Sequence, residues 1–347
     1  MKILILGANG FIGSNLSEAI LKRTPWHIVA MDMARDKIEN CLPNSRFDFF
    51  QGDMTVEKNW VSEQIQNCDV VLPLVAIATP ATYVQNPLKV FELDFEANLD
   101  IIKQCVKAKK RIIFPSTSEV YGMSPDLVFD EEDSHLVTGP IHKERWIYST
   151  SKQLLDRVIY AYGKHHELNY TLFRPFNWYG PKLDNIFNPK PGGSRVLTQF
   201  IGNILRGENI TLVDGGEQKR CFMHIDDGVD ALIKIIENKN DNAKQRIFNI
   251  GNPEENISIR TLAETLVKLI KQYPHYAETA SRTKLVDVTA EKYYGTGYQD
   301  VLLRVPAIKR AREFLGWSPK IDMESGLKQT LDFYLLDNKV KEKLEHA

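Results

Sequence analysis

The sequence predicts an α/β fold, a doubly wound parallel sheet followed by a smaller C-terminal lobe, and three observations support this prediction. A short apolar run opens the chain and leads directly into a glycine-rich loop. Similar apolar runs then alternate with segments of helix length as far as about residue 175. Beyond that point the alternation gives way to a stretch rich in proline and glycine, where we expect the second lobe to begin.

Five apolar runs predict strands that are buried on both faces, because they lack the polar alternation of a sheet with one wet face. Helix-length segments at 14–22 and 91–108 lie between them. A strand, a helix and a second parallel strand connect by a right-handed crossover, so we expect a doubly wound sheet. The predicted strands are residues 3–6, 28–31, 70–74, 111–114 and 170–173.

The stretch at 175–194, PFNWYGPKLDNIFNPKPGGS, opens the expected lobe, and a helix is expected over 195–206. Short apolar runs at 210–213 and 246–250 predict single strands that fit either part of the chain. We therefore expect the two parts to interleave rather than to be joined by one linker.

Composition excludes several classes of protein. The 347 residues carry a formal net charge of -1, with 43% hydrophobic and 26% charged residues, which is ordinary for a globular enzyme. This balance gives no overall attraction to nucleic acid or to a membrane surface, so neither is an expected partner. Four residues between Lys2 and the first glycine are too few for a signal peptide, and we expect a cytoplasmic protein. The four cysteines lack metal-site spacing, so we expect reduced thiols and no metal.

The glycine-rich loop follows the first predicted strand and opens the first predicted helix. Glycines there permit a tight turn and a close approach of backbone amides to a pyrophosphate, and the helix N-terminus favours an anion. The pattern alone is weak, but its position between a buried strand and a helix favours dinucleotide binding. The loop residues are Gly7, Ala8, Asn9, Gly10, Phe11, Ile12 and Gly13.

Asp32 ends the second predicted strand, 19 positions after Gly13. A carboxylate there can accept both ribose hydroxyls of an adenosine and repels a 2′-phosphate, so we expect NAD rather than NADP, although Arg35 nearby could accommodate a phosphate. Asp53, in the segment Gln51-Gly52-Asp53-Met54 where a further strand is expected to end, could bind the adenine amino group or simply form a turn. We therefore expect residues 1–175 to be an NAD-binding Rossmann domain, to which parts of 210–250 return, and 176–340 to be mainly a substrate-binding lobe.

A tyrosine and a lysine, Tyr148 and Lys152, stand four positions apart and so share one face of a predicted helix. An ammonium beside a phenol favours the phenolate and lowers the tyrosine pKa, which makes the tyrosine a usable base for a sugar hydroxyl. YxxxK alone is common on surface helices. In a chain with a nucleotide loop it favours catalysis.

A second polar group follows the predicted strand at 111–114, at the strand edge where ligands of open parallel sheets bind. Thr117 can hydrogen-bond the hydroxyl that Tyr148 deprotonates, and Glu119 can exchange protons farther along the sugar. The alternative is a turn in which Thr117 and Ser118 cap the strand end.

At this point the residues resemble a known family over essentially the whole chain, the extended short-chain dehydrogenase/reductases that act on nucleotide sugars. Within it the chain is most similar to the UDP-glucuronic acid decarboxylase domains of bifunctional polymyxin-resistance enzymes of the ArnA type. The segments that carry the resemblance are VVLPLVAIATP (70–80), FPSTSEVYGM (114–123), RWIYSTSKQLLDR (145–157), LFRPFNWYGPKLDN (172–185), DGGEQKRCF (214–222) and YYGTGYQDVLLR (293–304).

The resemblance implies NAD-dependent oxidation of UDP-glucuronic acid at C4, loss of carbon dioxide and formation of a UDP-4-keto-pentose. Catalytic roles are implied for Tyr148, Lys152, Thr117, Ser118, Glu119 and Arg304. Further cofactor contacts are implied for Asp53, Met54, Leu74 and Ala76, beside the loop residues and Asp32. Substrate contacts are implied for Ala78, Tyr83, Thr117, Ser118, Arg145, Asn177, Arg195, Arg220 and Tyr298. Each arginine taken singly could instead form a surface ion pair.

Several alternatives stay open. A UDP-xylose synthase shares Thr-Ser-Glu and would return the hydride to the 4-keto sugar. A 4,6-dehydratase normally has aspartate where Ser118 stands, and a 4-epimerase has no use for Arg304 beside a carboxylate. A regulator that binds NAD without chemistry is disfavoured, since Tyr148, Lys152, Thr117 and Glu119 are all present. Relatives pair through the helix near Tyr148 and the one over 91–108, so a homodimer or higher homo-oligomer is expected.

Overall fold

The computed structural model describes residues 1–187, 195–289, 292–293 and 304–337. Its centre is a seven-stranded sheet in the order β11-β6-β5-β4-β1-β2-β3, and all neighbouring strands are parallel. The predicted doubly wound α/β fold is confirmed. The strands are β1 (Lys2–Leu6), β2 (His27–Asp32), β3 (Phe47–Gln51), β4 (Val70–Pro73), β5 (Arg111–Pro115), β6 (Tyr170–Pro175) and β11 (Arg246–Ile250).

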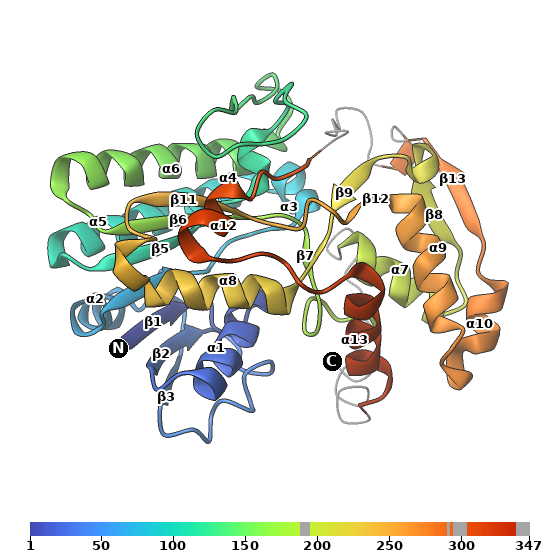
Figure 1. Cartoon of the computed structure of the whole chain (residues 1–347), viewed down its shortest axis with the longest axis horizontal. Helices are drawn as coiled ribbons and strands as arrows, with labels where there is room; N and C mark the ends of the chain where they lie inside the picture. The colour runs from blue at the N-terminus through green and yellow to red at the C-terminus, as the bar shows by residue number, and fades with distance from the viewer. Residues whose placement is uncertain (188–194, 290–291, 294–303, 338–347) are drawn as a thin grey trace.

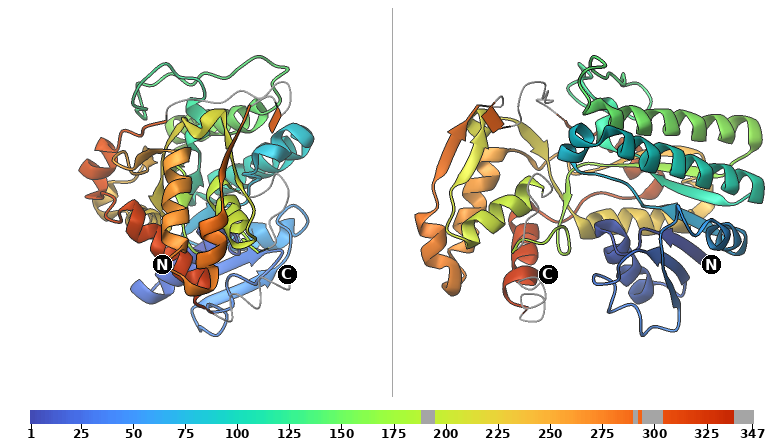
Figure 2. Two further views of the ribbon diagram at one scale, coloured as in Figure 1. Left: turned by 90° about the vertical axis from the view of Figure 1, so that its right-hand side faces the viewer. Right: turned by 180° about the vertical axis from the view of Figure 1, so that it is seen from behind.

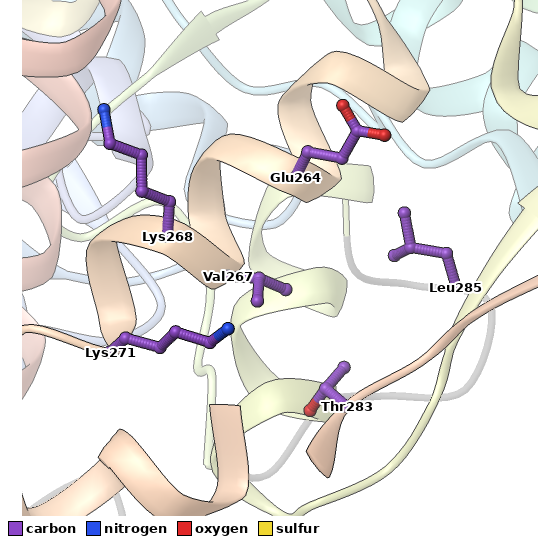
Figure 3. A pocket seen from close by; sticks show the side chains of 6 residues that line it. All are labelled: Glu264, Val267, Lys268, Lys271, Thr283 and Leu285. Carbon is purple, nitrogen blue, oxygen red and sulfur yellow. The ribbon is translucent and has the colours of Figure 1, made fainter. Parts of the chain in front are cut away.

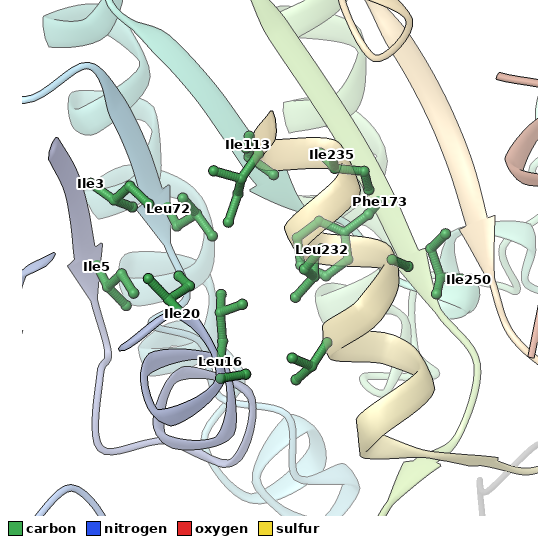
Figure 4. Close-up of a cluster of buried hydrophobic side chains, with 14 of the residues drawn as sticks. Ile3, Ile5, Leu16, Ile20, Leu72, Ile113, Phe173, Leu232, Ile235 and Ile250 are labelled. Atoms are coloured by element: carbon green, nitrogen blue, oxygen red, sulfur yellow. The ribbon is translucent and has the colours of Figure 1, made fainter. Parts of the chain in front are cut away.

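Helices cover both faces of this sheet and make a three-layer arrangement (Figure 1). On one face α1 (Phe11–Arg23) and α8 (Ile225–Glu237) pack against each other and on the sheet. Their core, shown in Figure 4, joins Ile3 and Ile5 of β1 to Leu16, Ile20 and Leu232. These side chains are fully buried, and each contributes on the order of 1.5–3 kcal/mol by leaving water.

The other face of the sheet is covered by α2 (Lys58–Asn67), α5 (Asn98–Ala108) and α6 (Trp146–His166). Here Leu4 and Leu6, the alternate residues of β1, meet Ile101 of α5 and Leu155 of α6. The residues of β1 that point to each face of the sheet are therefore apolar and buried. This explains why the sequence shows an uninterrupted apolar run there.

The helix expected over 91–108 is present but is not regular. It begins as α4 (Pro87–Phe91), continues as a π-helix, η1 (Glu92–Ala97), and ends as α5. A π-helical turn leaves backbone carbonyls without their usual partners and often occurs at functional sites. The buried Asn98 donates its Nδ2 to the carbonyl oxygens of Leu93 at 3.0 Å and Val75 at 3.3 Å, which ties the π-helix to the loop after β4.

The second lobe lies beside the sheet domain (Figure 2). Its helices α7 (Val196–Leu205), α9 (Ile259–Ile270) and α13 (Met323–Leu335) share a core of their own. Three two-stranded sheets complete it or link it to the main sheet: β8 (Ile210–Val213) with β13 (Leu285–Val288), β9 (Lys219–Cys221) with β12 (Asn256–Ser258), and β7 (Trp178–Tyr179) with β10 (Met223–His224). The remaining helices are α3 (Pro80–Gln85), α10 (Ala277–Arg282), α12 (Lys309–Leu315), η2 (Ser118–Tyr121), η3 (Asp214–Gly216), η4 (Lys239–Asp241) and η5 (Pro274–Tyr276).

The single strands predicted at 210–213 and 246–250 belong to different sheets. β11 joins the main sheet beside β6, whereas β8 pairs with β13 outside it. The four cysteines are all free and buried. No helix within the described residues combines the length and the apolar character needed to cross a bilayer.

Candidate active site

The predicted site residues follow several different strands of the main sheet. Because those strands are parallel, their carboxyl ends meet at one edge. The chain leaves β6 at this edge and passes through β7 into the second lobe, so the edge faces that lobe (Figure 1). Ligands of open parallel sheets bind at such an edge, where the strand order reverses. Here the reversal lies between β1 and β4.

The glycine loop has the shape of a cradle for a pyrophosphate. Gly7 has φ of 89°, and a Cβ on Gly13 would lie 2.3 Å from the Gly7 carbonyl oxygen, so no side chain fits there. Gly10 precedes α1 without a side-chain cap, which leaves the first amides of the helix available to an anion. Phe11 and Ile12 are half-buried and pack on the core behind the loop. The loop therefore fits a dinucleotide.

Asp32, at the end of β2, is joined to the same loop. Its Oδ2 accepts a hydrogen bond from the Asn9 backbone N–H at 2.8 Å. The Asn9 side chain donates in turn to Asp36 at 2.7 Å. Burial raises the pKa of Asp32 from its usual range, while the backbone N–H of Asn9 opposes the rise. Two carboxylates thus stand where the adenosine ribose of a dinucleotide is expected, which disfavours a 2′-phosphate.

The other predicted cofactor residues lie along the same edge. Asp53 accepts hydrogen bonds at its Oδ1 from the backbone N–H and the hydroxyl of Thr55, at 2.8 and 2.7 Å, which is the geometry of a turn. Met54 beside it is buried. After β4, Leu74 donates its N–H to the Leu6 carbonyl at 2.7 Å, and Ala76 is half-buried in the same loop. The turn expected as the alternative at Asp53 is present in the structure.

Tyr148 lies in the first turn of α6, and its side chain is buried against a second tyrosine. The rings of Tyr83 and Tyr148 stack with centroids 4.6 Å apart and an interplanar angle of 7°. A hydrogen bond joins Tyr148 to the side chain of Thr117. The predicted proximity of Thr117 to Tyr148 is therefore present.

Burial raises the pKa of Tyr148 well above that of an exposed tyrosine, and the charge of Asp94 raises it further, while the Thr117 hydrogen bond acts in the opposite direction. We expected Lys152 to lower this pKa. The fully buried ammonium of Lys152 instead donates to the Pro115 carbonyl at 3.0 Å and lies 4.7 Å from the centroid of the Phe114 ring. Desolvation of the phenolate is the larger effect in this structure.

Glu119, in η2, forms ion pairs with two arginines from distant parts of the chain. Arg145 donates to its Oε2 at 3.0 Å, and Arg304 donates to its Oε1. Both guanidinium groups are nearly buried, with side-chain exposures of 8% and 7%. Burial alone would raise the pKa of Glu119, but Arg304 and Arg145 together hold it below its usual range. Ser118, its neighbour, is buried.

The remaining predicted substrate residues are more dispersed. Asn177 adopts a left-handed backbone with φ of 42° and donates its Nδ2 to the Cys221 carbonyl at 3.2 Å. Arg195 forms an ion pair with Asp184 at 2.5 Å. Its positive charge also acts to lower the pKa of Tyr83 and of Tyr148. Arg220, on β9, contributes to the low pKa of Glu119. Ala78 is exposed in the loop before α3, and Tyr298 lies outside the described residues.

Two buried carboxylates near Lys152 had no counterpart in the sequence prediction. Asp94 is fully buried in η1, and Asp156, one turn after Lys152 in α6, is also buried. Both raise the pKa of Lys152 against the lowering caused by its burial. Asp156 could have been found from its spacing of four from Lys152. Nothing in the sequence marks Asp94.

A surface pocket shown in Figure 3 lies elsewhere. It is lined by side chains of α9 and β13 together with Thr283. None of its residues is a predicted site residue, so this pocket is separate from the candidate active site.

Several proteins of known structure share this fold. The chain is 52% identical to the PbgP3 protein from Burkholderia pseudomallei, over 99% of this chain and 98% of that one, with a TM-score of 0.89. It shares its fold with a UDP-glucuronic acid 4-epimerase from Bacillus cereus, at 24% identity over 99% and 100% of the chains and a TM-score of 0.79. A UDP-glucose 4-epimerase from Thermotoga maritima gives 23% identity over 96% and 98% and a TM-score of 0.78.

Residues 3–251 match the family described as the NAD dependent epimerase/dehydratase family. This match confirms the prediction that the cofactor is NAD and covers the glycine loop, Tyr148 and Lys152. The chain belongs to the NAD-dependent epimerase/dehydratase family.

Proposed function

We propose that the chain oxidises UDP-glucuronic acid at C4 and then releases carbon dioxide, leaving a UDP-4-keto-pentose. The observation that carries the proposal is that Arg145 and Arg304 bind one carboxylate, that of Glu119, two residues along the chain from Thr117. Two nearly buried guanidinium groups beside the candidate base are suited to a second carboxylate, that of a hexuronate.

In this reaction Tyr148 removes the proton of the C4 hydroxyl, and Thr117 holds that hydroxyl through its own side chain. When bound, NAD would supply the hydride acceptor for C4 and a positively charged ring that favours the phenolate. Gly7, Gly10 and Gly13 would hold its pyrophosphate, and Asp32 would hold its adenosine ribose. Lys152 would bind the nicotinamide ribose. Tyr148, Thr117 and Lys152 are buried, and charge interactions are strong in such a site.

The product of this oxidation is a β-keto acid, and its C5–carboxylate bond breaks because the new C4 carbonyl takes up the electron pair as an enolate. Arg304 would hold the departing carboxylate in line, and Glu119 would guide the proton that returns to C5. Its arginine partners keep Glu119 ionised at neutral pH, so it would orient the proton donor by accepting a hydrogen bond rather than supply the proton itself. Ser118 lies between Thr117 and Glu119 and shapes the same wall of the site.

The nucleotide part of the substrate would be held by residues of the second lobe. Arg195 and Arg220 would supply positive charge for the diphosphate, and Asn177 would contact the substrate. A UDP-glucuronic acid ligand is known in the related Bacillus cereus 4-epimerase, whose structure was determined in complex with UDP-glucuronic acid and NAD. We extend the same ligand to this chain as part of the proposal.

The direct test incubates the protein with UDP-glucuronic acid and NAD and follows NADH absorbance, released carbon dioxide and the sugar product. Stoichiometric NADH and a UDP-4-keto-pentose are expected. UDP-xylose without net NADH would assign the synthase reaction, and UDP-galacturonic acid without carbon dioxide would assign an epimerase. Either result would overturn the proposal of a released keto-pentose.

We further propose that two copies pair through α6 and the helix over 91–108, together with α4, which precedes it. Leu154 and Tyr160, on α6, have exposures of 45% and 55%, and Leu88 on α4 has 70%. Exposed apolar side chains on neighbouring helices suit an interface between copies. Light scattering should give a dimer, and Leu154→Asp should dissociate it. A monomeric wild-type chain at micromolar concentration would contradict the pairing.

A further inference from the structure

Asp94 is a fully buried carboxylate that the proposed reaction does not use. Its Oδ1 accepts a hydrogen bond from the Ile77 backbone N–H at 2.8 Å. Its Oδ2 is buried as well and has no hydrogen-bond partner among the described residues. A buried oxygen without a hydrogen bond is costly unless a nearby positive charge compensates for it. A cation close to Asp94 in the protein interior would offset this cost.

The irregular helix holds Asp94 in place. Asp94 lies in the π-helical turn η1, which packs against α6, the helix that carries Lys152. Asn98 donates to the carbonyl oxygens of Leu93 and Val75, and Ile77 donates to Asp94 itself. The π-helix is therefore tied at two points to the loop after β4, and the carboxylate of Asp94 is fixed on the side of η1 that is away from water.

The buried charges around Lys152 can be matched one to one. Asp156 accepts hydrogen bonds from Arg174 at 3.1 Å and from Ser116 at 2.7 Å, so its charge is balanced by an arginine that is also buried. The Lys152 ammonium has the neutral Pro115 carbonyl and the Phe114 ring as its contacts. Asp94 and Lys152 are the two buried charges that this pairing leaves, and each acts electrostatically on the other.

We propose that Asp94 is a positioning residue, the counter-charge that keeps the buried Lys152 ammonium protonated at neutral pH. This inference rests on the proposed function only where it concerns turnover. Burial disfavours a charged lysine, and a carboxylate in the same dry space restores the charged form. Asp94 would in this way let Lys152 bind the nicotinamide ribose as a cation.

The other titratable groups near this pair are either neutral or balanced by arginines. Burial raises the pKa of Asp94 itself to about 6, and Lys152 lowers it, so the carboxyl is ionised at neutral pH. Tyr148 faces Asp94 and is neutral, because its pKa is raised. Glu119 is neutralised by Arg145 and Arg304. Asp156 also raises the pKa of Lys152, but its charge is balanced by the ion pair with Arg174.

The first test needs neither substrate nor cofactor. Nζ resonances of ¹⁵N-labelled lysine, assigned with Lys152→Arg, are followed against pH in the NAD-free protein, in the wild type and in Asp94→Asn. Loss of the carboxylate should lower the pKa of Lys152 by about 1–3 units. Glu96→Gln is the matched control, because Glu96 is exposed on the same π-helical turn. An equal shift in both variants, or no shift in Asp94→Asn, would overturn the proposal.

The reciprocal variant keeps the proposal testable if Asp94→Asn does not fold. Lys152→Met removes the ammonium and leaves the π-helix and its hydrogen bonds unchanged. By linkage the pKa of Asp94, measured from its carboxyl ¹³C shift, should then rise by the same amount that Asp94→Asn lowers the pKa of Lys152. An unchanged Asp94 titration in a folded Lys152→Met protein would exclude the pair.

The second test uses turnover. If UDP-glucuronic acid is oxidised, the alkaline limb of the kcat profile should move to lower pH in Asp94→Asn by about 1–3 units, and stay in place in Glu96→Gln. A lower kcat with an unmoved alkaline limb would mean a merely structural role and would overturn the inference. Absence of any turnover in the wild type would instead contradict the proposed function, and the NMR titration would still decide the role of Asp94.

Discussion

Arg304 and Glu119 form a nearly buried ion pair across 185 positions of sequence. The pair joins the end of β5 to the segment that precedes α12, so a residue of the main sheet edge and a residue from the C-terminal part of the chain share one site. Arg145 binds the second oxygen of the same carboxylate. The proposed decarboxylation depends on this contact, because the same guanidinium groups would bind the substrate carboxylate.

Arg304→Ala should leave NAD affinity unchanged and reduce carbon dioxide release by more than about 10²-fold, because the substrate carboxylate loses its partner. Removing one member of a buried pair also costs on the order of 3–5 kcal/mol of stability, so folding is checked by thermal melting. Arg312→Ala, at an arginine whose side chain is 53% exposed, is the control and should behave as the wild type. Normal carbon dioxide release by Arg304→Ala would remove this arginine from the mechanism.

Tyr148→Phe should lower kcat by more than the ~10²-fold typical of losing a general base. The ring stacks on Tyr83 without its hydroxyl, so the fold and NAD binding should persist. Stopped-flow measurement of NADH formation checks the rate. Tyr160→Phe, at a half-exposed tyrosine on the same helix, serves as the control. Wild-type turnover in Tyr148→Phe would mean that another group takes the proton.

Glu131→Gln should stabilise the protein at pH 8 and have little effect at pH 4.5. Burial raises the pKa of Glu131 from 4.5 to about 7, because among the described residues only its Oε1 has a hydrogen-bond donor, the Asn249 N–H at 2.8 Å. With a raised pKa, the stability that the protonated carboxyl contributes is complete below pH 4.5 and is lost as the pH rises through about 7. The loss amounts to about 3 kcal/mol at most.

Urea unfolding at the two pH values measures this effect. Glu132→Gln is the control, since the neighbouring Glu132 side chain is 65% exposed and pairs with Arg310. Equal free energies of unfolding for wild type and Glu131→Gln at both pH values would show that Glu131 is ionised in the folded protein throughout.

Gly13→Ala should weaken NAD binding by at least about tenfold, or about 1.4 kcal/mol. Its Cβ would lie 2.3 Å from the Gly7 carbonyl oxygen, so the loop must open. Gly10→Ala is the matched comparison, because its Cβ would lie 3.2 Å from the same oxygen and requires a smaller displacement. Fluorescence titration with NAD measures both. Equal affinities for the two variants would contradict the proposal that this loop binds the pyrophosphate of NAD.

The sequence predicted β1, β2, β4, β5 and β6 well because these strands are buried on both faces, and uninterrupted apolar runs such as Ile3 to Leu6 are typical of such strands. The edge strand β3 is only partly buried and has no such run. The glycine loop was predictable for a similar reason, since its spacing is dictated by backbone sterics that only glycine satisfies. β8 and β11 could not be assigned to the main sheet or the lobe, because a strand of four or five residues does not specify which strand it pairs with.

The electrostatics of the site were harder to predict. Spacing placed Lys152 near Tyr148, but it gave no information about the burial of Tyr148 under Tyr83 or about Asp94, and these raise the tyrosine pKa that the lysine was expected to lower. The π-helical turn has no sequence pattern that distinguishes it from an ordinary helix. The contact of Arg304 with Glu119 could not be derived from the sequence, because the two residues are so far apart in the chain.

Phe129 connects the segment just after Arg304 with Tyr121, which lies two residues after Glu119. Its backbone donates to the Val305 carbonyl at 2.7 Å and accepts from the Ala307 N–H at 2.9 Å, and its ring stacks on Tyr121. The position of Arg304 relative to Glu119 therefore depends on a loop that contains no proposed catalytic residue. Insertions or deletions near Phe129 would move Arg304 relative to Glu119 and so alter the proposed decarboxylation, while every strand of the sheet stayed the same.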